Sequence, residues 1–423
     1  MNAESSNPRK RIPVDQVRPG MYVVGLDQPW LETPFLCHQR LIKNQEDIEV
    51  LKRRGIREVV IDPARGADVV PAPPADRVPS QTDGAGLSAD IARGAGKSSS
   101  AAESAFEAFA RELDACQLIQ QQALAAAESI FDGAMTGAPV SAQVAEKVVV
   151  DLLETIARSP EANLLLVQMR RFKEDLAMHG INVCVLSLVV NAVEAIASDA
   201  VALGLGALLH DVGETRLPRN LLHKMAGLTP AEERLIEQHP ALGAQLLEPC
   251  RDLPPEARRI VLEHHERLDG SGYPRHSRAG DISPLSQIVA LADLYDAMLS
   301  GRRRSVLQPI DALRQLFVLG QSGAFERNLV ERVIRSLGVY PVGTVVQLNT
   351  GERGIVVAAN HGDTLKPTLR IITSRLGGVL RHGPIVSLAE SGEERRIVGV
   401  LNPIKEGINP LALLKPAPEK AEV

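Results

Sequence analysis

The chain has 423 residues, of which 44% are hydrophobic and 23% are charged, and its formal net charge is −5. This length and balance exclude a wholly disordered protein and predict two or three folded domains. The chain lacks the basic excess of a duplex nucleic-acid binder, and aromatic residues, at 3%, are too few for single-strand stacking surfaces. We therefore expect no nucleic-acid polymer as a partner.

Residues 1–66 predict a small α+β module. Segments 21–26 and 56–61 have the Tyr and Val content of strands, and 45–54 is an amphipathic helix that ends at Gly55. No cluster in the module indicates chemistry, so its position alone predicts a regulatory or docking role. Residues 67–100 are rich in Pro and then in Gly, Ser and Ala, which predicts a flexible linker.

Residues 101–338 predict a helical domain. Its apolar residues recur at helical spacing, and the segment that begins at Thr229 has the Thr, Pro and Glu of a helix start. The main expected helices are 101–135, 144–157, 164–176, 182–196 and 284–299. Helix 101–135 could form a dimer contact or pack in the core, so a homodimer is one of two interpretations.

Residues 339–423 predict a small β-rich lobe with strands at 342–348, 354–358 and 368–373, and a loose tail after Pro410. The fold class is therefore mainly α, with a helical bundle between two small modules. We expect a cytoplasmic protein, because the four cysteines lie far apart and the polar N-terminus shows no signal peptide. The apolar runs 183–190 and 200–209 are too short to span a membrane.

Histidine and aspartate residues gather beside the apolar helices of the central domain. One histidine on an apolar face is more often a satisfied core residue, but a buried carboxylate costs several kcal/mol unless it is paired or bound to a metal. Imidazole and carboxylate ligands without thiolate favour iron or manganese at two adjacent centres, with zinc less indicated and Asp211 as the natural bridge. The candidate ligands are His179, His210, Asp211, His239, His264, His265 and Asp293.

Two sequence motifs resemble those of a known protein family. The run HDVG at 210–213 resembles the signature of the HD phosphohydrolase superfamily, and HHERLDGSGYP at 264–274 is similar to the second signature of its HD-GYP branch. The resemblance covers roughly residues 170–335, and the N-terminal module resembles a domain of unknown function often fused to this branch. The resemblance to the HD-GYP branch implies an HD-type helical bundle that hydrolyses cyclic di-GMP in bacterial second-messenger signalling.

The resemblance also implies site residues. By this resemblance, the seven candidate ligands bind two divalent ions. A third ion would be bound if Asp175, four residues before His179, is a ligand; the alternative is that Asp175 is a solvated helix carboxylate. The product would be linear pGpG, with further cleavage to GMP. The glycine-rich loop, otherwise a simple turn, would shape a surface for substrate or a signalling protein, with Tyr273 exposed. The implied substrate-binding residues are Asp269, Gly270, Gly272, Tyr273, Pro274 and Arg302.

Two positions depart from the family pattern. Glu214 stands where the family usually has a lysine near the phosphate, and Ser305 replaces the last basic residue of a segment that begins at Arg302. Glu214 could act in catalysis beside Asp211, either by binding a metal ion itself or by holding a residue that binds one. It could instead face solvent while Arg216 or Arg219 replaces the lysine, or it could weaken catalysis. Arg303 and Arg304 could compensate for Ser305.

Two hypotheses from different classes follow. The first is an active cyclic di-GMP phosphodiesterase, which the intact ligand set favours. The second is a catalytically weak or inactive module that binds the dinucleotide or docks a partner, which Glu214 and Ser305 favour. A different cyclic dinucleotide is a third interpretation of the substrate.

Overall fold

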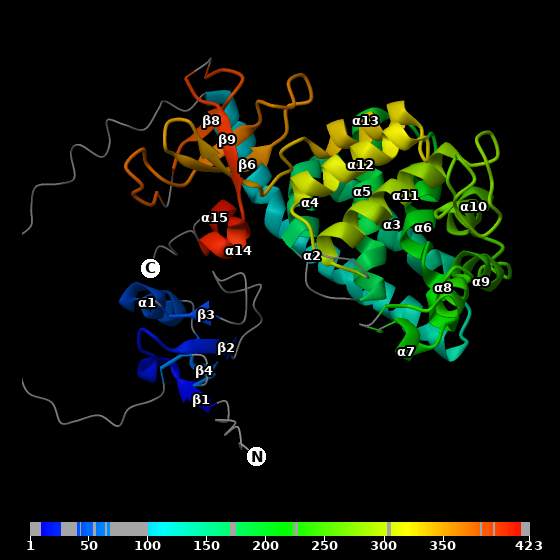
Figure 1. Cartoon of the computed structure of the whole chain (residues 1–423), viewed down its shortest axis with the longest axis horizontal. Coiled ribbons are helices and arrows are strands. Elements are labelled where there is room, and N and C mark those ends of the chain that lie inside the picture. The colour runs from blue at the N-terminus through cyan, green and yellow to red at the C-terminus, as the bar shows by residue number, and fades with distance from the viewer. Residues whose placement is uncertain are drawn as a thin grey trace, which may run out of the picture. The chain divides into compact units, whose positions relative to one another are not determined.

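A computed structural model describes residues 10–26, 40–42, 44–53, 56–63, 66–67, 100–169, 175–222, 224, 227–302, 306–380, 383–391 and 394–415 (Figure 1). Nearly all of the predicted linker lies outside these ranges, as do Gly55, Arg303, Arg304 and Ser305. By its contacts the chain divides into two units. One contains Met1–Ala95 with Leu401–Leu413, and the other contains Gly96–Val400 with Leu414–Val423.

The first unit has a four-stranded antiparallel sheet in the order β1-β4-β2-β3. One face of helix α1 supplies Ile48 and Leu51 to its core, where Val59 and Ile61 of β4 are also buried. Strand β1 was not predicted, whereas α1 and β2 lie close to their predicted positions. The bounds are β1 (Lys10–Pro13), β2 (Tyr22–Leu26), β3 (Arg40–Leu41), α1 (Gln45–Arg53) and β4 (Glu58–Ile61).

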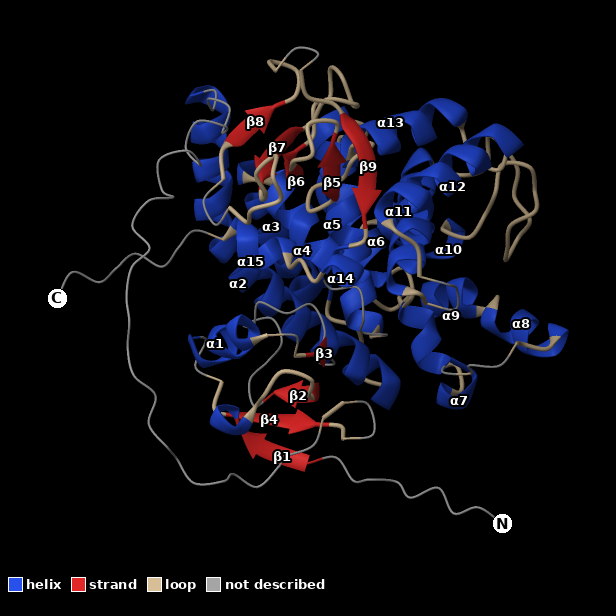
Figure 2. Ribbon diagram, turned by 60° about the vertical axis from the view of Figure 1, so that its left-hand side comes forward, coloured by secondary structure: helices blue, strands red, loops and turns tan. Residues whose placement is uncertain are grey.

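The second unit is mainly helical, as predicted, and its helices surround α5 (Figure 2). Helix α5 contacts α2, α3, α4, α6, α11 and α13, and every one of its residues from Ala177 to Asn191 is buried. The helices are α2 (Ser100–Thr136), α3 (Ala142–Arg158), α4 (Pro160–Met169), α5 (Leu176–Glu194), α6 (Ala200–Leu209), α7 (Arg219–Leu222), α8 (Pro230–Ile236), α9 (His239–Leu246), α10 (Pro255–Glu263), α11 (Pro284–Ser300), α12 (Pro309–Ser322) and α13 (Arg327–Leu337).

Helix α5 is longer than the apolar runs seen in the sequence. Its 19 residues are long and apolar enough to cross a membrane by length and composition, but 83% of its most apolar stretch is buried inside the structure. This burial is that of a core helix, which must be apolar on all sides because neighbours cover all of them.

Two helix boundaries matter for the site. Helix α8 ends at Ile236, and His239 is the first residue of α9. The capping box is as predicted, since Thr229 Oγ1 accepts from the amide of Glu232 and the Glu232 carboxylate accepts from the amide of Thr229. His179 lies in the first turn of α5, which begins six residues before the predicted start.

A five-stranded sheet in the order β8-β7-β6-β5-β9 follows the helices. Its core includes Val346, Val356 and Leu369, and β8 contacts α2. The two last strands were not predicted, and the predicted loose tail after Pro410 begins with a helix. The bounds are β5 (Val345–Leu348), β6 (Arg353–Ala358), β7 (Thr368–Ile371), β8 (Ile385–Ser387), β9 (Ile397–Leu401), α14 (Pro403–Glu406) and α15 (Pro410–Leu414).

Candidate metal centre

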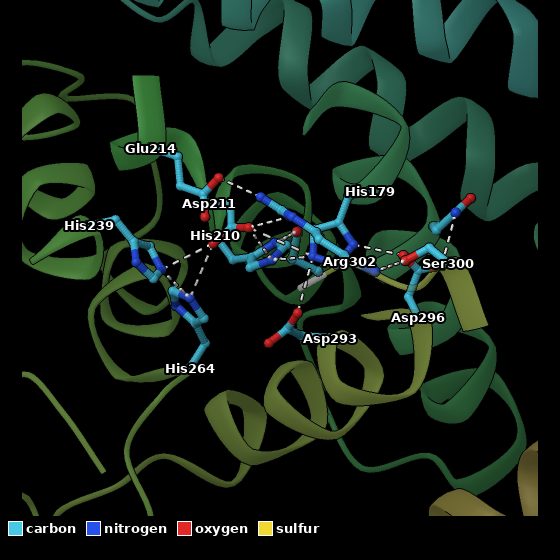
Figure 3. Close-up of polar contacts among 12 residues, drawn as sticks. His179, His210, Asp211, Glu214, His239, His264, Asp293, Asp296, Ser300 and Arg302 are labelled. Atoms are coloured by element: carbon cyan, nitrogen blue, oxygen red, sulfur yellow. Dashed lines mark hydrogen bonds and ion pairs between the residues drawn. The ribbon is translucent and has the colours of Figure 1, made fainter. Parts of the chain in front are cut away.

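The ends of several helices meet at one buried place in the helical unit (Figure 3). His210 caps the C-terminus of α6, His264 caps that of α10, and His239 begins α9. His179 comes from the first turn of α5 and Asp293 from the middle of α11. Helix ends suit the assembly of a site because they bring side chains from different directions to one point.

The seven predicted ligands form two groups that could each hold a metal ion. His179, His210 and Asp293 make one group, and the donor atoms of that group lie within 4.8 Å of one another. The other group meets the same limit and consists of Asp211, His239, His264 and His265. The structure therefore brings together all seven candidate ligands that the sequence singled out.

Asp211 lies between the two groups. Its Oδ1 is 3.1 Å from His239 Nε2 and 3.6 Å from His264 Nε2. Its Oδ2 is 3.5 Å from His210 Nε2 and 3.7 Å from His179 Nε2. Each carboxylate oxygen thus faces a different group, which is the arrangement that a bridging ligand requires.

Backbone carbonyl groups fix three of the histidine rings. Nδ1 of His210, His239 and His264 donates to the carbonyl oxygen three residues earlier, at 2.7, 2.8 and 2.8 Å. A proton on Nδ1 leaves the lone pair of a neutral ring on Nε2, which points into the site. The local turn at each helix end therefore prepares the ring as a metal ligand.

Two pairs of histidine Nε2 atoms lie close enough together to bind a shared cation. His239 Nε2 lies 3.1 Å from His264 Nε2, and His210 Nε2 lies 3.3 Å from His179 Nε2. Two neutral rings with Nδ1 protonated would set lone pairs against each other at these distances, and a metal cation bound by both nitrogens would remove that repulsion. A buried set of imidazole and carboxylate donors meets the requirements for a divalent metal such as iron or manganese.

Asp296 was not predicted to belong to the site. Its Oδ2 accepts a 2.7 Å hydrogen bond from His179 Nδ1, and its Oδ1 accepts one of 2.9 Å from Asn182 Nδ2. Asp296 therefore does for His179 what the backbone carbonyls do for the other rings. One signal was present in the sequence, since Asp296 follows Asp293 by one helical turn and shares its face of α11.

The ionisable groups are strongly perturbed. Burial lowers the pKa of His210 to about 3. Burial also opposes protonation of His179, but hydrogen bonds to Asp293 and Asp296 raise its pKa to about 9. Although burial favours the neutral acid, nearby His210 and Arg302 hold the pKa of Asp211 well below its usual range. Asp211 is therefore a carboxylate at neutral pH and available to cations.

Glu214 does not face solvent, so that interpretation of the residue is wrong. It is 3% exposed, and its carboxylate binds Nη2 of Arg302, whose Nη1 lies 2.7 Å from Asp211 Oδ2. Glu214 lies outside both groups of candidate ligands. Arg216 and Arg219 are exposed and do not take the place of the missing lysine.

Asp175 lies at the start of α5, beside the candidate metal centre in sequence but outside its two ligand groups. It is the N-cap of α5, where its Oδ1 accepts a 2.9 Å hydrogen bond from the amide of Ala177. It belongs to neither ligand group formed by the described residues. This structure gives the third metal no support.

The glycine-rich loop packs against the site. Tyr273 is half-buried and not exposed as expected, because its ring stacks on His265 with centroids 4.6 Å apart. Gly272 is buried, while Asp269 is exposed and accepts hydrogen bonds from the amide and hydroxyl of Ser271. Gly270 has a φ of +82°, which suits glycine, and Pro274 is half-buried.

Comparison with known proteins identifies the class. A model of the HD domain matches residues 185–327, and a model of a domain of unknown function (DUF3391) matches residues 9–145. A cyclic di-GMP phosphodiesterase of Pseudomonas aeruginosa, PA4108, is 31% identical over 393 residues, which cover 92% of this chain and 91% of that protein. A 3′3′-cGAMP-specific phosphodiesterase of Vibrio cholerae is 35% identical over 129 residues, covering 30% of this chain and 24% of that one.

Among solved structures, the HDG"Y"P protein Bd1817 of Bdellovibrio bacteriovorus matches 77% of this chain and 98% of its own, at 17% identity and a TM-score of 0.44. The long match to the Pseudomonas protein decides the assignment. The chain belongs to the HD-GYP branch of the HD-domain phosphohydrolases, which confirms the family and the phosphodiesterase class predicted from the sequence.

Proposed function

We propose that the chain hydrolyses cyclic di-GMP to linear pGpG with the aid of two divalent ions, iron or manganese, in the cytoplasm. The position of Asp211 carries the proposal, because its two oxygens face two separate groups of ligands. When bound there, such ions would supply a water-derived nucleophile at neutral pH and neutralise charge on a phosphate.

The chain's own residues prepare this chemistry. The carbonyl-bound histidines present Nε2 without reorganisation, and the carboxylate of Asp211 sets the spacing between the two ligand groups. Among the described residues, Arg302 is a cation placed to meet a phosphate oxygen, since its guanidinium lies beside Asp211 and guanidinium groups suit phosphate. Glu214 holds the other side of that guanidinium. We infer that Glu214 serves the reaction through Arg302.

The choice of cyclic di-GMP is supported by the relative that matches along most of the chain, whose name gives that substrate. The match to the Vibrio relative that is specific for 3′3′-cGAMP covers only 30% of this chain. Both substrates contain two phosphodiester bonds, so the metal centre alone does not distinguish them. The bases must be distinguished by residues around the centre.

A direct assay tests the proposal. Protein loaded with Mn²⁺ or Fe²⁺ under anaerobic conditions is incubated in parallel with cyclic di-GMP and 3′3′-cGAMP, and products are separated by chromatography. We expect pGpG to accumulate first, GMP to follow if the linear product is cut again, and cGAMP to be the poorer substrate. Binding of cyclic di-GMP without turnover would instead favour the inactive binding module.

A further inference from the structure

One histidine of the candidate metal centre is supported differently from the others. The rings of His179, His210, His239 and His264 each donate from Nδ1 to an oxygen acceptor. Within the described part of the chain, the ring of His265 makes no hydrogen bond. Its pKa is held well below the usual range by burial, so the ring is neutral at pH 7.

The face of His265 is covered by Tyr273. The two rings lie with centroids 4.6 Å apart and an interplanar angle of 29°, which is a stacked contact. The ring of His264 packs against His265 at 4.2 Å and that of His239 at 4.9 Å, so His265 is enclosed by rings. Aromatic contacts of this kind stabilise the packing and restrict rotation of the ring.

The backbone keeps Tyr273 against His265. The amide of Tyr273 donates to the carbonyl oxygen of His265 at 3.2 Å. A Cβ atom built on Gly272 would lie 2.4 Å from that same carbonyl oxygen, so only glycine permits this approach. The glycine before the tyrosine is thus explained by the contact between loop and ligand.

A buried carboxylate holds the far side of the loop. Glu266 is 2% exposed, and its two oxygens accept hydrogen bonds from the amides of Arg275 at 2.7 Å and Ser277 at 2.9 Å. A buried carboxylate that lost these donors would pay a large desolvation cost, so the contacts fix the loop firmly. Glu266 directly follows His265 in sequence, so it connects the loop to the metal centre over one peptide bond.

We propose that this loop is a support of the metal centre, in which Tyr273 is a positioning residue for His265 and Glu266 anchors the loop that carries Tyr273. The stack replaces the Nδ1 hydrogen bond that fixes the other four rings. The inference rests on the metal centre of the proposed function, and it holds whichever phosphodiester is the substrate.

Metal affinity provides the test, without any nucleotide present. Mn²⁺ binding is measured by calorimetry for the full chain and for Tyr273→Phe, Tyr273→Ala and Glu266→Gln. We expect Tyr273→Phe to bind like wild type, because the stack is kept. Tyr273→Ala should lose about 10- to 100-fold in affinity at one of two sites, the usual effect of removing the partner of a metal ligand. Glu266→Gln should lie between them.

Two controls keep the result specific. Arg275→Ala changes an exposed side chain of the same loop and leaves the amide that Glu266 binds, so it should bind like wild type. In a His265→Ala background, Tyr273→Ala should cause no further loss. An equal loss in both backgrounds would show a general structural effect and overturn the inference, as would wild-type affinity in Tyr273→Ala. Absence of Mn²⁺ binding by the wild type would overturn the proposed function itself.

Discussion

Arg302 Nη1 lies 2.7 Å from Asp211 Oδ2, so the cation that follows α11 directly contacts the carboxylate shared by the two ligand groups. The same guanidinium binds Glu214, and the side chain of Arg302 is only 17% exposed. Glu214, which stands where the resemblance implies a lysine, is therefore the partner of a guanidinium that comes from another part of the chain.

Arg302→Gln should destabilise the metal-free protein. Removing the cation leaves two buried carboxylates without their partner, and breaking a buried ion pair typically costs about 3–5 kcal/mol. Urea unfolding in the presence of a chelator measures the change. The matched control is Arg327→Gln, which breaks an exposed pair with Glu331 and should change the free energy of unfolding by less than about 0.5 kcal/mol. Equal effects in the two variants would contradict this view of Arg302.

Glu214→Gln should leave the metal content unchanged, because Glu214 lies outside both ligand groups. It should weaken substrate binding, since Arg302 loses the anion that holds it. Elemental analysis after dialysis gives the metal content, and KM and kcat give the second effect. Loss of one metal per chain would show that Glu214 is a ligand after all.

Asp296→Asn should reduce metal affinity about 10- to 100-fold, because an amide is a poorer acceptor for Nδ1 of His179 than a carboxylate. Titration with Mn²⁺ measures this effect. Asp311→Asn, at an exposed position near the start of α12, is the control and should bind as wild type does. Wild-type affinity in Asp296→Asn would show that the ring of His179 needs no such partner.

Gly213→Ala should disrupt the centre through the backbone. A Cβ on Gly213 would lie 2.0 Å from the carbonyl oxygen of His239, so the segment after Asp211 would move away from the start of α9. We expect a loss of stability of about 3 kcal/mol and reduced metal content. Gly227→Ala is the control, since nothing lies within 4 Å of its added Cβ. Thermal unfolding and elemental analysis compare the two; similar results would contradict the close approach.

Much of the helical unit could be predicted because apolar periodicity and caps are local signals. The helix that ends at Gly301 is an example, since its serine N-cap, proline and left-handed glycine C-cap are all visible in the sequence. The predicted helix began at Asn182, so the first six residues of α5 were missed, among them His179, whose buried ring is bound by Asp293 and Asp296. Strand β8 has three residues, too few for an alternating pattern.

The candidate ligands could be predicted from their types and from a resemblance, but their partners could not. The contact of Glu214 with Arg302 joins residues 88 positions apart, and no local pattern encodes it. The burial of Tyr273 was missed for a similar reason. Glycine and proline indicate a turn, and the sequence does not say which ring the turn packs against.

Metal counting tests the central claim most directly. Elemental analysis of the purified chain, of Asp211→Asn and of His239→Ala is compared after reconstitution with Mn²⁺. Asp211 faces both ligand groups, whereas His239 faces only one. We therefore predict two ions per chain for the wild type, about one for His239→Ala and fewer than one for Asp211→Asn. Fewer than two ions in the wild type, or two in Asp211→Asn, would contradict a dinuclear centre bridged by Asp211.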